Sequence, residues 1–346
     1  MTRHVGLLPL LIAPIILAAS ARANTELGVE GERFTVNGTP LFLLGASYYG
    51  GAGASDETVR RDLDDLRHDG FNWIRVWATW SAGDRDISAV GADGSPREPW
   101  LGRLKKLVEA CDEHGMLVDV TLTRQRGGRG PSRLANPDDH RRAVQTLLTA
   151  LRASRNWYLD LANERNVGDG RFVGYDELKS LRDRAKEVDP ARLVTASHSS
   201  DDDAFLSALP QYLNTVRVDF VAPHRGRHKG TAAETEAFTR HALGRMRETG
   251  RVVPVHFQEP FRRGYADWQP VSDDYVQDLR GAVMGGAAGW CFHNGDDRPS
   301  PDHRPRRSFD LGERRLYEQL DDVELDVVGR LKKVADGTSP QARPAK

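Results

Sequence analysis

The apolar positions of this chain form eight short runs, and each run is followed by a segment with helical spacing of its apolar residues. Short apolar runs bounded by turn residues predict buried strands, whereas apolar residues at i, i+3 and i+4 predict amphipathic helices. The expected strands cover 41–49, 73–80, 117–123, 157–164, 193–199, 220–224, 252–259 and 287–293. The expected helices cover 57–69, 101–114, 137–153, 177–188, 201–213, 232–249, 273–284 and 313–336.

Eight strand–helix units in one chain predict an α/β fold, a single-domain (β/α)8 TIM barrel over residues 41–337. A doubly wound open sheet is the competing fold, but it usually carries a G-x-G-x-x-G loop after its first strand, and segment 50–53 lacks that spacing. Residues 24–40 predict an N-terminal segment with a short β-hairpin at Asn37-Gly38, which would close the bottom of the barrel. Residues 338–346 are expected to be a disordered tail.

The first 23 residues have the pattern of a secretory signal peptide. A positive start at Arg3 and His4 precedes an apolar core at 5–19, and Ala21-Arg22-Ala23 fits a cleavage site. A membrane anchor is the alternative, but about 15 apolar residues fall short of the roughly 20 that a spanning helix needs. The mature protein is therefore expected to be exported, periplasmic or extracellular, with no membrane association.

Charge and cysteine content narrow the range of partners. The formal net charge is −1, and removal of residues 1–23, which contain two arginines and no acid, makes it −3. This near-neutral value argues against a nucleic-acid partner. Cys111 and Cys291 fall in different sectors of the expected barrel, so we expect two free, buried thiols. A monomer is expected.

Two of the predicted strands end in a glutamate, Glu164 and Glu259. Catalytic groups of such barrels come from the carboxyl ends of the strands. A carboxylate there is costly unless water or substrate meets it, so the pair predicts two carboxyl groups acting on one bond, against the plain alternative of solvated loop acids. Other strand ends supply aromatic, amide, histidine and arginine side chains, which suit a polyhydroxylated ligand. These candidate substrate-binding residues are Tyr49, Arg75, Asn163, His198, His224 and Trp290.

The motifs FTVNGTP at 34–40, LRHDGFNWIRVW at 66–77 and DLANE at 160–164 carry a specific resemblance. With them the chain resembles the retaining glycoside hydrolases of the (β/α)8-barrel clan, and glycoside hydrolase family 5, the cellulase family, is the nearest comparison. The resemblance implies that Glu164 is the acid/base and Glu259 the nucleophile. It further implies that Arg75 supports the nucleophile and that Asn163 binds the sugar 2-hydroxyl. Trp290 would form the floor of the subsite at the cleaved bond.

The chain departs from the family at three places. Arg165 stands where the family usually has proline, and strand 117–123 ends without the histidine often found there. The sequence His224-Arg225-Gly226 stands where His-x-Tyr is common, so the aromatic partner of the nucleophile is not identified by sequence. None of these changes removes a glutamate.

The expected function is an exported retaining glycosidase that cleaves β-glycosidic bonds of a poly- or oligosaccharide without metal or organic cofactor. Retaining enzymes hold the two carboxyl groups about 5–5.5 Å apart and inverting enzymes roughly 6.5–9.5 Å. A non-catalytic carbohydrate-binding barrel is the alternative, and a metal-dependent hydrolase is a second one. Arginines also cluster in loops on the expected active face. The cluster reflects either an arginine-rich composition or a binding site for an anionic glycan, whose carboxylates arginine can bind bidentately. The clustered arginines are Arg124, Arg126, Arg129, Arg133, Arg225, Arg227, Arg262 and Arg263.

Overall fold

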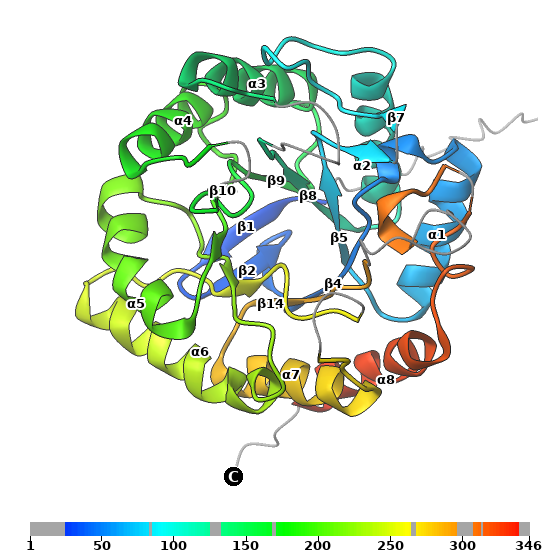
Figure 1. Ribbon diagram of the computed structural model, residues 1–346, viewed down its shortest axis with the longest axis vertical. Coiled ribbons are helices and arrows are strands. Elements are labelled where there is room, and N and C mark those ends of the chain that lie inside the picture. The colour runs from blue at the N-terminus through cyan, green and yellow to red at the C-terminus, as the bar shows by residue number, and fades with distance from the viewer. Residues whose placement is uncertain are drawn as a thin grey trace, which may run out of the picture.

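The computed structural model describes residues 25–82, 85–124, 133–167, 171–263, 268–295, 307–312 and 314–338. Short parallel strands surround a central axis, and helices cover the outside of the ring (Figure 1). Seven strands form one sheet in the order β10-β9-β8-β5-β4-β14-β13. They are β4 (Leu43–Ser47), β5 (Trp73–Trp77), β8 (Leu117–Thr121), β9 (Trp157–Asp160), β10 (Val194–Thr195), β13 (His256–Phe257) and β14 (Gly289–Phe292).

Two further contacts close this sheet into a ring. β11 (His198–Ser199) follows β10 along the chain and pairs in parallel with β12 (Pro223–His224). A parallel bridge then joins Val221, just before β12, to Val255, just before β13. Each of the eight strand segments is therefore hydrogen-bonded to both neighbours, and the predicted (β/α)8 barrel is confirmed.

Eight helices lie outside the ring in the described part of the chain. They are α1 (Asp56–His68), α2 (Trp100–Glu113), α3 (Pro137–Ala150), α4 (Tyr175–Val188), α5 (Asp202–Pro210), α6 (Thr231–Glu248), α7 (Ser272–Gly285) and α8 (Asp322–Thr338). Side-chain caps begin several of them: the side chains of Ser55, Asn136 and Asp201 accept from the backbone N–H three residues on.

The last helix begins at Asp322, so the sequence-based start at residue 313 is wrong. Asp321 Oδ1 accepts from the backbone N–H of Glu324, and Glu324 Oε2 accepts from the N–H of Asp321. This reciprocal pair of bonds satisfies the free amides of a helix start, which places the boundary at this point. The segment before it is held against α1, because Asp62 accepts from the backbone N–H of Leu316.

Alternation along the strands decides which side chains enter the barrel. In β5, Ile74 and Val76 join the core beneath the helices, whereas Trp73 and Arg75 point into the barrel. The Trp73 ring packs against Gly45 so closely that a Cβ at residue 45 would lie 2.1 Å from it, so only glycine fits there. The same alternation turns Asp119 in β8 toward Arg75 at 3.2 Å.

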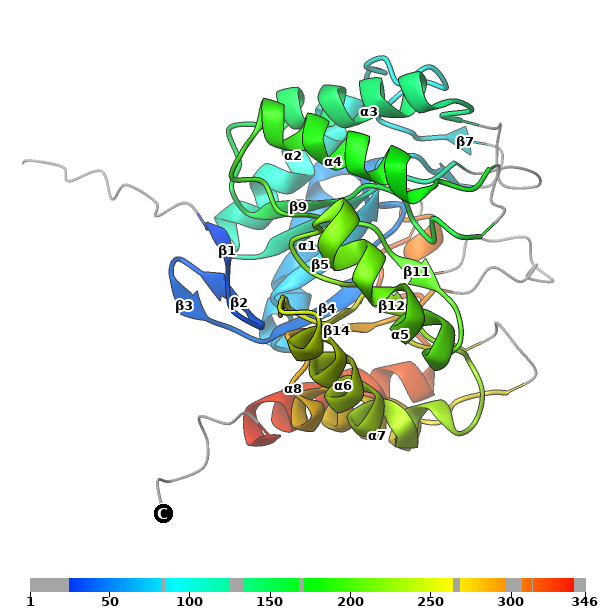
Figure 2. The ribbon, with the colours of Figure 1, turned by 90° about the vertical axis from the view of Figure 1, so that its left-hand side faces the viewer.

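The N-terminal residues form a three-stranded antiparallel sheet in place of a simple hairpin. Its strands are β1 (Leu27–Glu30), β2 (Arg33–Val36) and β3 (Thr39–Pro40). Phe34 of β2 enters the barrel and meets Phe220 edge-on at 5.0 Å and His256 at 5.3 Å. Figure 2 shows this sheet at the end of the barrel opposite β11 and β12. It covers the amino ends of the strands, and their carboxyl ends form the other face.

Both cysteines are free and buried, as predicted. No helix within the described ranges combines the length and apolar character of a membrane span. The expected signal peptide at 1–23 lies outside the described residues. The expected tail at 338–346 also lies outside them except for Thr338, the last residue of α8.

Candidate active site

Glu259 follows β13, and both of its carboxylate oxygens are held by donors. Oε1 accepts from the Tyr49 hydroxyl at 2.8 Å and from Arg75 Nη1 at 2.9 Å, and Oε2 accepts from Arg227 Nη2 at 3.0 Å. Burial by itself raises the pKa of Glu259, but the Arg75 guanidinium and further positive groups outweigh it and hold the pKa well below its usual range. Glu259 is therefore a buried anion.

Glu164 lies in the turn after β9 with a positive φ of 42°, a left-handed conformation that is uncommon outside glycine. The backbone around it is tied down by side chains. Arg124 donates from Nη1 to the Asn163 carbonyl at 2.7 Å and from Nη2 to the Glu164 carbonyl at 3.2 Å, while the Glu164 N–H donates to Ser197 Oγ at 2.9 Å. These bonds stabilise a strained turn that points the Glu164 side chain across the barrel mouth.

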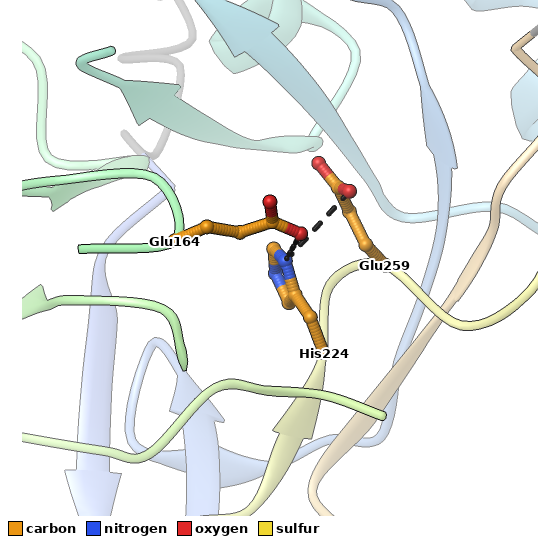
Figure 3. Close-up of side chains that lie close together, drawn as sticks. All are labelled: Glu164, His224 and Glu259. Carbon is orange, nitrogen blue, oxygen red and sulfur yellow. Dashed lines mark hydrogen bonds and ion pairs between the residues drawn. The ribbon is translucent and has the colours of Figure 1, made fainter. Parts of the chain in front are cut away.

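The two glutamates meet at His224 of β12 (Figure 3). One ligand atom from each of the three side chains lies within 4.8 Å of the others. Arg75 Nη1 is 3.2 Å from His224 Nε2, and because arginine only donates, Nε2 must accept. The imidazole proton is therefore on Nδ1, which lies 3.1 Å from Glu164 Oε1 and donates to it.

The environment of Glu164 differs from that of Glu259. Its side chain keeps an exposed fraction of 21%, against 7% for Glu259. Burial raises the pKa of Glu164, whereas the hydrogen bond from His224 and the positive charge of Arg227 lower it, and the net pKa lies below its usual value. Arg227 Nη2 is 3.9 Å from Glu164 Oε1. In this arrangement both carboxyl groups are ionised.

Within the described residues, Glu164, His224 and Glu259 also form a group that could hold a metal ion. Their donor atoms are already engaged, because guanidinium groups occupy both oxygens of Glu259 and His224 presents an N–H to Glu164. A divalent cation would have to displace Arg227 and sit beside the fixed charge of Arg75. The residues present do not fit a metal.

Arg75 is the central cation of the site and is fully buried. Besides Glu259, it donates from Nη2 to Asp160 Oδ2 at 3.1 Å and to Asn163 Oδ1 at 2.9 Å. Since the amide oxygen of Asn163 faces Arg75, its NH2 group points away from the guanidinium. Sequence reasoning placed Arg75 and Asn163 here but missed Asp119 and Asp160. A signal was present, because each is a charged residue inside an otherwise apolar strand.

Trp290 is not a sugar platform, so that prediction is wrong. Its side chain is fully buried in the core between the barrel and the helices, and its Nε1 donates to Asp278 Oδ2 of α7 at 2.6 Å. The physical reason is strand alternation: Cys291 of β14 points into the barrel, so its neighbour Trp290 points out. The rings packed against Tyr49 are instead Trp77 at 4.8 Å and Phe309 at 5.7 Å.

His198 and Tyr49 lie in the walls of the site. Tyr49 contacts Glu259 directly and also lies 2.9 Å from His293 Nε2, so it supplies the hydroxyl partner that the His224-Arg225-Gly226 segment lacks. His198 Nδ1 is bonded to the Tyr212 hydroxyl at 2.9 Å, and burial, followed by the charge of Arg165, lowers its pKa to about 4. Whether His198 contacts substrate stays a prediction.

Most of the clustered arginines serve the scaffold. Arg124 holds the Glu164 turn, Arg133 donates to the Val90 carbonyl, and Arg225 makes a bidentate pair with Asp202. Arg262 donates toward His293, and Arg263 pairs with Asp321. Arg126 and Arg129 lie outside the described residues. Among the described members of the set, Arg227 contacts the two glutamates. Binding of an anionic glycan by the cluster stays a prediction.

The fold and site define a (β/α)8 barrel with two close carboxylates at the carboxyl ends of its strands. No protein-family model matches the sequence, and no curated protein matches it. Solved structures do match. An endo-1,4-β-mannanase from Rhizomucor miehei shares 13% identity at a TM-score of 0.62, over 91% of this chain and 99% of its own.

Two further structures give the same picture. A glycoside hydrolase family 5 protein from Bacteroides vulgatus shares 13% identity at a TM-score of 0.66, over 90% of this chain and 71% of its own. An endo-β-1,4-mannanase from Thermotoga petrophila shares 15% identity at a TM-score of 0.62, over 90% and 79% of the two chains. The fold is thus that of the family 5 barrels.

Proposed function

We propose that this protein is an exported retaining glycoside hydrolase that cleaves β-glycosidic bonds of a poly- or oligosaccharide. The observation that carries the proposal is the approach of Glu164 and Glu259 to within 4.8 Å in two different environments. This approach of the nearest carboxylate oxygens is closer to the roughly 5–5.5 Å between the carboxyl groups of retaining enzymes than to the roughly 6.5–9.5 Å of inverting enzymes.

In the first step Glu259 attacks the anomeric carbon, and Glu164 protonates the departing glycosidic oxygen. The buried anion held by Arg75 and Tyr49 suits the nucleophile, because its position is fixed by two donors on one oxygen. Glu164 is the more exposed carboxyl group and can reach the leaving group. A sugar bound between the two groups displaces water and separates Glu164 from Arg227, so the pKa of Glu164 rises toward that of an acid.

In the second step the glycosyl ester on Glu259 is hydrolysed. Glu164, ionised after its proton transfer, takes a proton from the attacking water, and Glu259 leaves as a carboxylate. The Arg75 guanidinium stabilises the returning negative charge. The NH2 group of Asn163 is available to a sugar 2-hydroxyl during both steps.

The structural neighbours indicate which polysaccharides to test first. Two of them are endo-β-1,4-mannanases, so mannan is the first polymer to assay, followed by cellulose and xylan. Export is proposed from the pattern of residues 1–23. N-terminal sequencing of the protein secreted by its host is expected to begin at Asn24.

The decisive experiment is covalent labelling. A 2-deoxy-2-fluoro glycoside with an activated leaving group is expected to trap the intermediate on Glu259, which mass spectrometry of a peptic digest locates. Absence of labelling with every tested sugar, together with no hydrolysis of any polymer, would overturn the proposed function.

One observation favours a second candidate, a carbohydrate-binding barrel without turnover. Arg227 lies against both glutamates, 3.0 Å from Glu259 and 3.9 Å from Glu164, and helps to keep both ionised. An ionised Glu164 cannot donate a proton, so a sugar that failed to displace Arg227 would bind without being cleaved. Saturable binding of an oligosaccharide by calorimetry, with no product by chromatography, would support this candidate.

A further inference from the structure

Arg75 faces more buried negative charge than one cation can balance. Its guanidinium lies 3.2 Å from Asp119, 3.1 Å from Asp160 and 2.9 Å from Glu259, and the three carboxylate side chains are between 0 and 7% exposed. Arg227 approaches Glu259 from the open side and does not reach the two aspartates in the ion pairs of the structure. Unbalanced buried charge is costly, and the usual remedy is that one carboxyl group binds a proton.

Asp119 is the member of this cluster best placed to carry the proton. Oδ2 accepts from Gln258 Nε2 at 2.8 Å, and Oδ1 lies 2.8 Å from Thr121 Oγ1. The hydroxyl bond can reverse, so that a protonated Asp119 donates to Thr121 while its other oxygen still accepts from Gln258. Burial, opposed by Arg75 and reinforced by Asp160, raises the pKa of Asp119 to about 7.

We propose that Asp119 is a positioning residue for the nucleophile: by carrying a proton, it leaves the positive charge of Arg75 to Asp160 and Glu259. This inference rests on the proposed retaining function. Asp119 is fully buried, and its two carboxyl oxygens are engaged by Thr121 and Gln258, so it does not touch substrate. It acts through Arg75, whose Nε faces Asp119 and whose Nη1 faces Glu259.

The consequence appears in the second step of the reaction. Glu259 is uncharged while it carries the sugar and must leave as an anion. Arg75 stabilises that anion best when Asp119 is neutral. Ionisation of Asp119 gives Arg75 a third anionic partner, makes Glu259 a poorer leaving group, and slows hydrolysis of the intermediate.

The surroundings of Asp119 contain other titratable groups whose effects must be separated from its own. These groups are Arg75 of β5, Tyr158 and Asp160 of β9, His256 of β13, Glu259 just after β13, and Cys291 of β14. Burial lowers the pKa of His256 to about 3 and raises the pKa of Tyr158 and Cys291 above their usual values. The pKa of Asp119, raised by burial to about 7, lies near neutral pH, between the lowered pKa of His256 and the raised pKa values of Tyr158 and Cys291.

The substitution Asp119→Asn mimics the protonated form. Its NH2 group can donate to Thr121 while its carbonyl accepts from Gln258. The matched control is Asp278→Asn, a fully buried carboxyl group of α7 whose pKa burial raises to about 6 but which contacts Thr235 and Trp290 outside the barrel. Both variants neutralise a buried acid, and only the first changes the charge around Arg75.

The first measurement needs no substrate. Carbonyl-carbon NMR of the 13C-labelled protein between pH 4 and 9 is expected to show one aspartate carboxyl resonance that titrates near pH 7 and is absent from the Asp119→Asn protein. An Asp119 resonance that titrates below pH 5 would overturn the proposal.

The second measurement is the pH profile of kcat with a dinitrophenyl glycoside, whose rapid departure makes hydrolysis of the intermediate rate-limiting. The wild-type kcat is expected to fall about tenfold between pH 6 and 8, as a group titrating near 7 requires, with covalent enzyme accumulating. Asp119→Asn should keep wild-type kcat at pH 6 and lose this decline, whereas Asp278→Asn should retain it. If the Asp119→Asn enzyme were active and its kcat still fell between pH 6 and 8 as in the wild type, the role of Asp119 would be refuted and the retaining function would stand. If Glu259 could not be labelled, both the retaining function and the role of Asp119 would be refuted.

Discussion

Arg227 donates from Nη2 to Oε2 of Glu259 at 3.0 Å, on the carboxylate oxygen that neither Arg75 nor Tyr49 contacts. The glutamate is thus bound from both sides, by a fully buried cation below and a partly exposed cation above. Arg227 thus adds a second positive charge beside Glu259, and this charge favours the ionised form of the carboxyl group.

Substitution of Arg227 is expected to shift the pH profile in a defined direction. A nearby cation favours the ionised form of a carboxyl group, so Arg227→Gln should raise the pKa of both Glu259 and Glu164. Both limbs of the kcat/KM profile should move to higher pH. Arg245→Gln, an exposed pair with Glu248, is the control and should leave the profile in place. A shift to lower pH would contradict the assigned charges.

Replacement of the nucleophile should abolish turnover in a way that a small anion can repair. Glu259→Ala removes the attacking oxygen and leaves a space beside Arg75 that azide can enter. Added azide is expected to restore cleavage of an activated aryl glycoside and to yield a glycosyl azide, identified by NMR. Glu57→Ala, at an exposed position of α1, should behave as wild type. Full activity of the Glu259→Ala protein on a polysaccharide would refute the role.

Loss of the acid/base should depend on the leaving group. Glu164→Gln is expected to slow hydrolysis of a natural glycan by about 10²–10⁴-fold, because its glycosidic oxygen needs a proton to depart. Formation of the intermediate from a dinitrophenyl glycoside should be nearly unaffected, since that leaving group departs without help. Pre-steady-state bursts of dinitrophenol measure this step. Equal losses with both substrates would assign Glu164 a different role.

Trp290 should matter for stability and not for sugar binding. Trp290→Phe leaves Asp278 without its indole donor in a buried position, which should lower the free energy of unfolding by about 1–3 kcal/mol. Urea unfolding measures the loss, and KM for the preferred oligosaccharide should stay within twofold. Phe309→Ala tests the ring stacked on Tyr49 and should raise KM instead. The reverse pattern would restore Trp290 as the platform.

Short apolar runs and the strand–helix order made the barrel predictable, because both are local properties of consecutive residues. The same local pattern placed Glu164 and Glu259 at strand ends, and two buried strands that end in carboxylates are recognisable without a structure. It could not reveal that the last helix starts at Asp322, since that boundary depends on a reciprocal pair of hydrogen bonds between Asp321 and Glu324.

What the tertiary structure alone decided is which side chains meet across the barrel. A Trp at a strand end looks equally suitable for either face, and only the register of β14 with β4 and β13 turned Trp290 outward and Cys291 inward. Asp119 and Asp160 stand out in the sequence as charged residues in apolar strands, but only closure of the ring shows that both contact Arg75. Arg75 and Glu259 are 184 positions apart in sequence, and Arg227 and Glu259 are 32 apart. They become partners because a closed barrel brings distant strand ends into one small ring of side chains.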